Sequence, residues 1–556
     1  MNIIHSSIWN DQTGTFVAVS ENTRSAGKKI SSCTSAAVGA GSFGLKLLAV
    51  SLMMACGASA YAQPVGGVVS AGAATIGGTS GNMTITQTTP NVAINWQSFG
   101  IKAGESVQFV QPGSSSVALN RVIGADPSSI LGSLSSNGKV FLVNPNGILF
   151  GQGASVNVGG LLASTLAISD TNFMARNYQF SGAGTGTVLN QGAINAATGG
   201  YVALLGANVS NQGVISAQLG TVALAAGNAV TLDMAGDKLL NITVDQGAVN
   251  ALVENGGMIR ADGGQVLMTT QAAGSLLANA VNNTGVIQAQ TLQNVGGTIM
   301  LLGGMSSGTV NVGGTLDASA PNGGNGGFIE TSAAQVKVQD NVHVTTAAAQ
   351  GLTGNWLIDP PDFIIGAGGD IAGSTLGAAL VTNNITILSS SGSSGTGGDI
   401  FVNDAVSWTA SGAPTTLTLL AVRDVNVNAA ITATNGNLAI CCGRDVNVNA
   451  KITTTNGSVL LSAGRDVNIV RSVATPLAPE NNLAGITTTD GNIEICAARD
   501  VILNNAFDHA PLITLTRGSV TAGQDLANLG VPRGLTLMAG TAATGPGSAG
   551  GTVQFI

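Results

Sequence analysis

Aspartates are the residues whose spacing comes closest to that of an active site. Asp359 and Asp362 flank a double proline, and a pair of carboxylates can supply a general acid and a general base. The spacing alone does not fix the geometry of this pair. Four further aspartates follow arginines in Arg-Asp-Val triplets, which begin at Arg423, Arg444, Arg465 and Arg499. Because each aspartate holds the same position in a repeat, we interpret them as a structural Arg/Asp ladder or turn cap.

Other catalytic and metal-binding residues are scarce. Beyond residue 62 the histidines are His343 and His509, which stand in unrelated contexts. This scarcity argues against a Ser-His-Asp site and against a histidine-rich zinc site. The glycine-rich calcium-binding nonapeptide of some β-helices is also absent. We therefore predict no catalytic residues, no metal and no cofactor.

Three cysteines lie in the repeats. Cys441 and Cys496 each stand four residues before a repeat aspartate, and Ser462 holds this position in the copy between them. Two repeats at ~4.8 Å each would separate their Cα atoms by about 10 Å, which is beyond the ~7 Å limit for a disulfide. Cys442 is expected to point to the opposite face. We predict buried free thiols, with an intermolecular disulfide as the alternative.

The repeats also define the elements that carry these residues. The first three Arg-Asp-Val triplets are evenly spaced, and the fourth follows after a longer interval, which predicts an insertion around residues 472–482. Within a repeat, apolar and polar residues alternate, as in Val425, Asn426, Val427 and Asn428, and this period of two indicates β-strands. Short strands bury one face only when repeats stack. The predicted fold is an all-β, right-handed parallel β-helix with rungs of about 20 residues.

Composition supports this fold and excludes several classes. Of 556 residues, 79 are glycine, 8% are charged and 44% are hydrophobic, which fits a packed β protein better than a disordered chain. Lys and Arg total 19 against 27 Asp and Glu, so no basic footprint for nucleic acid is present and anionic partners are disfavoured. A β-propeller is the main rival, but an aromatic content of 4% argues against its blade packing.

The N-terminal segment is predicted to be a cleaved export signal. Lys46 precedes an apolar run over residues 47–55, which is shorter than the ~20 residues that a transmembrane helix needs. An Ala-x-Ala motif ends at Ala62, so we place the mature N-terminus at Gln63. An uncleaved membrane anchor is the alternative. The first thirty residues resemble the extended signal-peptide region of Gram-negative type V secretion proteins, which implies Sec-dependent export.

Asn144, Pro145, Asn146 and Gly147 form the most distinctive motif. Asn, Pro and Gly at the first, second and fourth positions suit a type I turn, and apolar strands flank it. The turn is expected mainly to close one rung. Together with residues 91–99, 119–122, 130–143 and 148–165, it closely resembles the N-terminal secretion domain of filamentous haemagglutinins and other two-partner secretion exoproteins. The resemblance implies that the motif helps to nucleate the β-helix and to contact the transporter, although a second family motif, Asn-Pro-Asn-Leu, is missing.

These observations divide the chain into an extended signal peptide (1–62), a secretion domain with the first β-helix section (63–345), a proline-containing break (346–370) and a second solenoid section (371–556). The break rests on residues 354–363, a segment similar to one in these exoproteins. Its two prolines lack the N–H that a strand ladder needs.

The resemblance implies a secreted or surface-exposed adhesin of a Gram-negative bacterium. Its expected partner is an outer-membrane β-barrel transporter, and a host cell-surface receptor or glycan is a further one. A cytolysin or contact-dependent toxin carrier is one alternative, since that group uses the same secretion domain. A β-helical polysaccharide-active enzyme is a third, less favoured hypothesis, because the fold alone assigns no site.

Overall fold

The computed structural model describes residues 5–10, 15–20, 63–233, 240–271, 279–390, 397–471, 484–505, 511–516, 534–540 and 552–555. The chain divides into two units, Met1–Ser59 and Ala60–Ile556. In the first unit, β1 (His5–Asn10) pairs antiparallel with β2 (Thr15–Ser20). Within the described residues, no helix is both long enough and apolar enough to cross a membrane.

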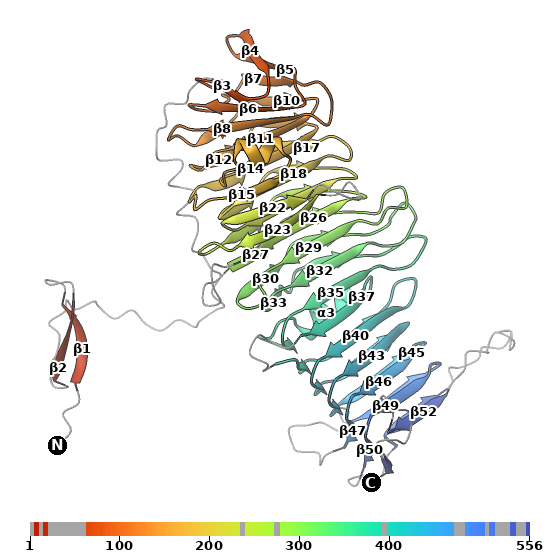
Figure 1. Cartoon of the computed structure of the whole chain (residues 1–556). Coiled ribbons are helices and arrows are strands. Elements are labelled where there is room, and N and C mark those ends of the chain that lie inside the picture. Colours follow the sequence, from red (N-terminus) through yellow and green to blue (C-terminus); the bar gives the residue numbers. More distant parts are fainter. Residues whose placement is uncertain are drawn as a thin grey trace, which may run out of the picture. The chain divides into compact units, whose positions relative to one another are not determined.

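The second unit is a parallel β-helix, as the repeats predict (Figure 1). Each rung contributes one strand to a sheet that we call the main sheet, and this sheet continues through the described part of the helix. Its parallel strands are β6 (Asn91–Trp96), β8 (Val117–Val122), β11 (Lys139–Val143), β14 (Gly160–Ser164), β18 (Tyr201–Gly206), β21 (Thr221–Ala226), β26 (Gln265–Thr270), β29 (Thr298–Leu302), β32 (Phe328–Ser332), β35 (Asn355–Asp359), β37 (Asn384–Ser389), β40 (Thr415–Ala421), β43 (Gly436–Cys442), β46 (Val459–Ala463), β49 (Ile493–Ala497) and β52 (Leu535–Ala539).

Two further sheets complete the N-terminal rungs. The second sheet contains β5 (Asn82–Gln87), β7 (Ser106–Val110), β10 (Ser133–Ser136), β13 (Ser155–Val158), β17 (Ala193–Ala196), β20 (Val214–Ser216), β25 (Met258–Arg260), β28 (Val286–Gln288), β31 (Thr315–Asp317) and β34 (His343–Thr345). The third contains β9 (Ser128–Ile130), β12 (Ile148–Phe150), β16 (Thr187–Asn190), β19 (Asn208–Asn211), β24 (Leu252–Asn255), β27 (Asn279–Asn283), β30 (Gly308–Val312) and β33 (Gln335–Val338). At the N-terminal end, β3 (Val68–Ala71) and β4 (Ala74–Thr79) pair antiparallel with β6 and β5.

The C-terminal rungs use two other sheets beside the main sheet. One contains β36 (Phe363–Ile365), β38 (Ile400–Val402), β41 (Val425–Val427), β44 (Val446–Val448), β47 (Val467–Val470), β50 (Val501–Asn504) and β53 (Val553–Phe555). The other contains β39 (Val406–Thr409), β42 (Ile431–Thr434), β45 (Lys451–Thr455), β48 (Gly485–Thr489) and β51 (Ile513–Thr516).

Register and burial explain the sequence repeats. Leu438 of β43 pairs with Leu417 in the rung before it and with Val459 in the rung after it, and all three point into the core. These two steps along the chain are equal, whereas the next step, from Val459 to Ile493, is longer. The predicted insertion at 472–482 lies outside the described residues. The alternating apolar positions therefore build one continuous core inside the helix.

The asparagines of four Asn-x-Gly segments form a buried ladder on the third sheet. The side-chain N–H groups of Asn190, Asn211 and Asn255 each donate to the Oδ1 atom of the next asparagine at 2.8 Å, and the ladder ends at Asn283. All four side chains are buried, so each amide needs a partner, which the next rung supplies.

Two of the three sheets change near the double proline. β35 pairs with β32 and β37, so Pro360 and Pro361 do not interrupt the main sheet as their missing N–H groups had suggested. The second and third sheets end at β34 and β33, and the new sheets begin at β36 and β39. Between them α3 (Gly373–Leu380) contacts both β34 and β39. The proposed domain boundary at 346–370 lies just before this helix.

Candidate functional site

The motif predicted as a turn joins β11 to β12. The N–H of Gly147 donates to the carbonyl oxygen of Asn144 at 3.1 Å, which closes a four-residue turn. The Asn144 side chain is fully buried; it accepts the N–H of Asn146 and donates to the Asp126 carbonyl and the Ser128 hydroxyl, each at 3.0 Å. These contacts satisfy a buried amide and fix the turn to the previous rung.

The turn is also held by the rungs on both sides. Asn146 donates from Nδ2 to the Gly124 carbonyl of the previous rung at 2.9 Å. In the next rung, a Cβ atom on Gly186 would lie 2.5 Å from the nitrogen of Gly147, so glycine is required for this close approach. Pro145 and Asn146 are exposed, whereas the first and last residues of the turn are buried. The turn therefore presents two side chains to solvent from a fixed backbone.

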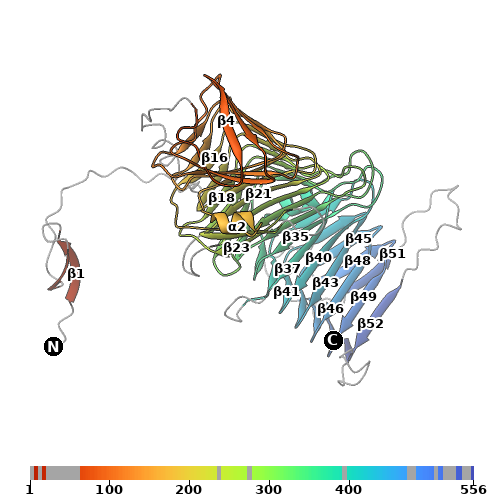
Figure 2. The same cartoon turned by 45° about the horizontal axis from the view of Figure 1, so that its top comes forward.

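A second hydrophobic cluster, which we call the satellite cluster, lies against the outer face of the main sheet. It is covered by α2 (Asp170–Met174) and by an antiparallel sheet of β15 (Tyr178–Ser181), β22 (Ala229–Asp233) and β23 (Asn241–Gln246), which we call the satellite sheet. Figure 2 shows α2 and β23 beside the main-sheet strands β18 and β21. Phe141 of the main sheet contacts Phe173 and Tyr178 edge-on, with ring centroids 6.0 and 5.3 Å apart. The cluster holds the antiparallel sheet of β15, β22 and β23 against the β-helix.

Sequence reasoning did not predict the satellite cluster. Its signal is a change of spacing between paired strands of the main sheet. Leu161 of β14 pairs with Val202, and Thr221 of β21 pairs with Gln265. Each of these steps along the chain is about twice as long as the step between β18 and β21, yet adds only one rung. The extra residues form α2, β15, β22 and β23.

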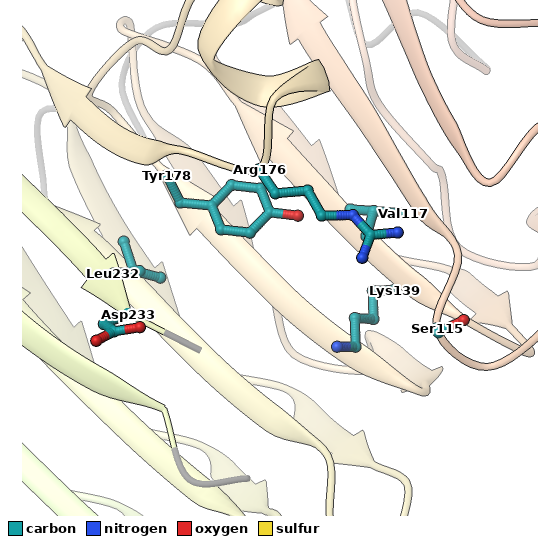
Figure 3. A pocket seen from close by; sticks show the side chains of 7 residues that line it. All are labelled: Ser115, Val117, Lys139, Arg176, Tyr178, Leu232 and Asp233. Carbon is teal, nitrogen blue, oxygen red and sulfur yellow. The ribbon is translucent and has the colours of Figure 1, made fainter. Parts of the chain in front are cut away.

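A pocket of about 350 Å³ lies where the satellite sheet meets the main sheet (Figure 3). At one end are Ser115, Val117, Lys139 and Arg176, at the other are Leu232 and Asp233, and Tyr178 lies between them. Their proximity could not be predicted from the sequence, because these residues are widely separated along the chain and no basic run marks them.

Burial and like charge shape the electrostatics of this pocket. Burial lowers the pKa of Lys139, and the nearby Arg176 guanidinium lowers it further. The Lys139 ammonium lies 5.1 Å from the centroid of the Tyr201 ring. Burial raises the pKa of Tyr178, against the opposite effect of Arg176. The Tyr201 hydroxyl is buried, has no hydrogen-bond partner among the described residues, and its pKa is raised by burial.

The structure confirms the Arg/Asp ladder. The Arg444 side chain donates from Nε to Asp424 at 2.7 Å and from Nη2 to its other carboxylate oxygen, and the Asp445 N–H also donates to Asp424 at 3.1 Å. The same pattern links Arg423 to Asp399 and continues in the following rungs. Burial alone would raise the pKa of Asp424, but the hydrogen bonds from the Arg444 side chain and the Asp445 N–H, together with the positive charges of Arg444 and Arg423, outweigh it and lower the pKa. These carboxylates are structural.

Asp359 and Asp362 have different surroundings. Asp362 accepts the N–H of Asp399 at 3.0 Å. Asp359 lies at the end of β35; burial raises its pKa, and the negative charge of Glu330 raises it further. The Asp359 Oδ1 atom is buried without a hydrogen-bond partner among the described residues. The charged neighbour of Asp359 is thus Glu330 rather than its predicted partner.

The cysteines are free, and their predicted frame is confirmed. Cys441 pairs with Ser462 in the main sheet, which pairs in turn with Cys496. The predicted burial is wrong, because all three thiols are half-buried. Cys442 packs against the core, and burial raises its pKa to about 11.

The remaining predicted positions lie at the edge of the described structure or outside a cluster. Ala62 and His509 lie outside the described residues, and Gln63 is the first described residue of the second unit. His343 is exposed on β34. Within the described part of the chain, no group of three or more His, Cys, Asp or Glu side chains could hold a metal ion.

Two family models match the chain. Residues 1–50 match the extended signal peptide of the type V secretion system, and residues 60–317 match the TPS, or two-partner, secretion domain. The chain carries a two-partner secretion domain. This domain contains the 144–147 turn, the satellite cluster and the pocket. Together, the signal peptide and the secretion domain direct Sec-dependent export and secretion through the outer membrane of a Gram-negative bacterium.

Two heme/hemopexin-binding proteins of Haemophilus influenzae are similar in sequence. One is 35% identical over 257 residues, which cover 44% of this chain and 28% of that protein. The other is 30% identical over 284 residues, which cover 46% of this chain and 30% of that protein. The match therefore spans less than a third of these relatives. The crystal structure of the HMW1 secretion domain from the same species aligns with a TM-score of 0.44 and 20% identity, over 82% of this chain and all of that one.

Proposed function

We propose that the two-partner secretion domain delivers this chain to an outer-membrane β-barrel transporter through the 144–147 turn. The observation that supports this role is that two residues of the turn are buried and two are exposed. Asn144 and Gly147 are buried in the stack, whereas Pro145 and Asn146 are exposed. A fixed backbone with two exposed side chains is suited to recognition, because binding then orders little further chain. The mature chain of this proposal begins at Gln63, after cleavage behind Ala62.

Export can be tested by immunoblotting cells and medium, with and without the candidate transporter. We expect transporter-dependent release of a chain whose mass corresponds to an N-terminus at Gln63. An Asn146→Ala variant should be exported less, whereas Asn195→Ala, which removes an exposed asparagine hydrogen bond on β17, should be exported normally. Release without the transporter, or periplasmic retention with it, would contradict the proposal.

The buried half of the turn needs a separate measurement. Asn144→Ala removes the partner of several polar groups, which should destabilise the domain by about 1–3 kcal/mol. Urea unfolding of the purified chain measures this loss. If Asn146→Ala impairs export at unchanged urea midpoint, its role is recognition; a loss of export that tracks the midpoint would indicate a folding role only.

The exported β-helix acts, in this proposal, as an adhesin that binds a host cell-surface receptor or glycan and performs no catalysis. The ladder supports a structural use of the repeats, because its carboxylates accept hydrogen bonds from the next rung. Binding of secreted protein to host cells is the direct assay. We expect attachment without haemoglobin release from erythrocytes and without release of reducing ends from acidic polysaccharides. Lysis would favour the cytolysin, and new reducing ends would favour the enzyme.

A second candidate function is the binding of heme or of hemopexin. The names of two relatives suggest it, and one of them is 35% identical over 257 residues. Hemin titration followed by visible absorbance, together with capture of hemopexin on immobilised chain, tests this candidate. A saturable spectral shift or stoichiometric capture would support it, and the absence of both would leave the adhesin proposal.

A further inference from the structure

The pocket beside the satellite sheet concentrates positive charge in an acidic chain. The chain carries a net charge of −8, yet Lys139 and Arg176 line the same pocket. Among the described residues, no carboxylate lies within ion-pair distance of either side chain. Two like charges that line one pocket repel each other, and an anion between them would lower this repulsion.

The backbone at Arg176 points to the same conclusion. Arg176 follows α2 with a φ of 60°, in the left-handed region that non-glycine residues seldom adopt. Its N–H donates to the Phe173 carbonyl at 3.0 Å, and Phe173 is anchored in the satellite cluster. This conformation is therefore imposed by packing. It directs the exposed Arg176 side chain over the pocket, on the side of Lys139 (Figure 3).

The other lining groups define the shape of a ligand. Ser115 and Tyr178 bring hydroxyls, which can donate or accept, and Val117 and Leu232 bring apolar surface. Asp233 lies at the opposite end from the two cations, where a carboxylate can accept hydrogen bonds from hydroxyl groups (Figure 3). About 350 Å³ is at the small end of ligand pockets and suits one sugar ring.

We propose that this pocket binds the carboxylate of an acidic sugar, with Lys139 and Arg176 on the carboxylate and Asp233 on the ring hydroxyls. Charge-assisted hydrogen bonds from Arg and Lys are the strongest that a carboxylate receives. A phosphate group shares this charge but lacks ring hydroxyls for the opposite end. The proposal names a class of ligand for the adhesin. Only the biological role of this binding rests on the proposed adhesion. Binding itself is a property of the purified chain.

Isothermal titration of the full secreted chain tests the site. The probes are glucuronate, N-acetylneuraminate, glucose and inorganic phosphate. We expect saturable binding of at least one acidic sugar and none of glucose. Lys139→Met keeps the apolar stem over Tyr201, and Arg176→Asn places a residue that tolerates positive φ. Each variant should weaken binding about tenfold or more. Lys102→Met, a lysine outside the pocket, should not change it.

The possible outcomes distinguish sugar binding in the pocket from adhesion to host cells. Equal binding by the wild type and by a variant that carries both Lys139→Met and Arg176→Asn, or no binding of either acidic sugar, would overturn the proposal. Pocket-dependent binding of phosphate alone would overturn the sugar assignment. Thermal melting of the ligand-free variants shows whether they fold. Binding that persists in the purified chain while cells bearing acidic glycans are not recognised would refute the adhesin and leave the pocket proposal supported.

Discussion

At the scale of single residues, the ionised Asp359 carboxylate lowers the stability of the folded chain, and a substitution can remove this effect. Its folded pKa is raised above the ordinary 3.8 by burial and by Glu330, so its unfolded form loses the proton more readily as pH rises. Above pH 3.8 this residue therefore lowers stability, and below it the difference disappears. We expect Asp359→Asn to raise the urea midpoint at pH 7 and to leave it unchanged at pH 3.

The matched control for this prediction is Asp362→Asn. An asparagine at 362 can still accept the Asp399 N–H, so we expect its urea midpoint at pH 7 to match that of the wild type. If Asp359→Asn lowers the midpoint at pH 7, the Ser390 hydrogen bond, which lowers the pKa of Asp359, outweighs the effects of burial and of Glu330.

Residue-scale features were predictable where neighbours in sequence are neighbours in space. The turn of Asn144 and Gly147 follows from four consecutive residue types, and the Arg/Asp ladder follows from a fixed repeat position. The pocket was not predictable in the same way, because Lys139 and Arg176 meet only after an insertion folds back over the main sheet.

At the scale of elements, the Arg/Asp ladder links each rung to the next through the carboxylate of one aspartate. Asp445 is buried and accepts from Arg465 and from the Asp466 N–H. Asp445→Ala would leave that buried N–H without a partner, which costs about 1–3 kcal/mol. We expect this loss in urea unfolding, with hydrogen exchange faster at β44 and β47 than at β13. Uniform acceleration along the helix would show that the ladder does not act between neighbours.

The satellite sheet should unfold locally while the β-helix stays folded. Phe180 of β15 is buried in the satellite cluster, so Phe180→Ala should cost about 3–5 kcal/mol there. We expect faster proteolysis within β15 and β22, with the main-sheet strand β18 still protected. Phe109→Ala, inside the helix core, is the matched control and should expose the rungs themselves. Equal exposure of β18 in both variants would show that the satellite sheet and the helix unfold together.

The elements differ in how far the sequence predicts them. From β40 to β46 the rungs repeat at a constant interval, because each strand pairs with its own copy, so periodicity alone indicates the β-helix. The satellite strands have no copy, and their apolar residues pack on the outer face of the main sheet. No periodic pattern marks such a contact. The same holds for α3, which interrupts two sheets where only the double proline signals a change.

At the scale of the whole molecule, we expect the rung of α3 to be the weakest connection in the stack. A solenoid is stabilised by contacts between neighbouring rungs, and here only the main sheet pairs continuously. Gly377 of α3 packs on β39, where a Cβ atom would lie 2.3 Å from the Ser407 carbonyl oxygen. Gly377→Leu would overpack this contact at a cost of about 1–3 kcal/mol.

The expected result is a loss of cooperativity between the two sections. In hydrogen exchange across a urea series, residues 397–471 should lose protection at lower urea in Gly377→Leu than in the wild type, while residues 117–233 keep their midpoint. Ala378→Leu, at an exposed neighbouring position of α3, should leave both midpoints unchanged. If both sections shift together in Gly377→Leu, the main sheet alone couples them, and the chain from β3 onward unfolds as one unit despite the change of sheets.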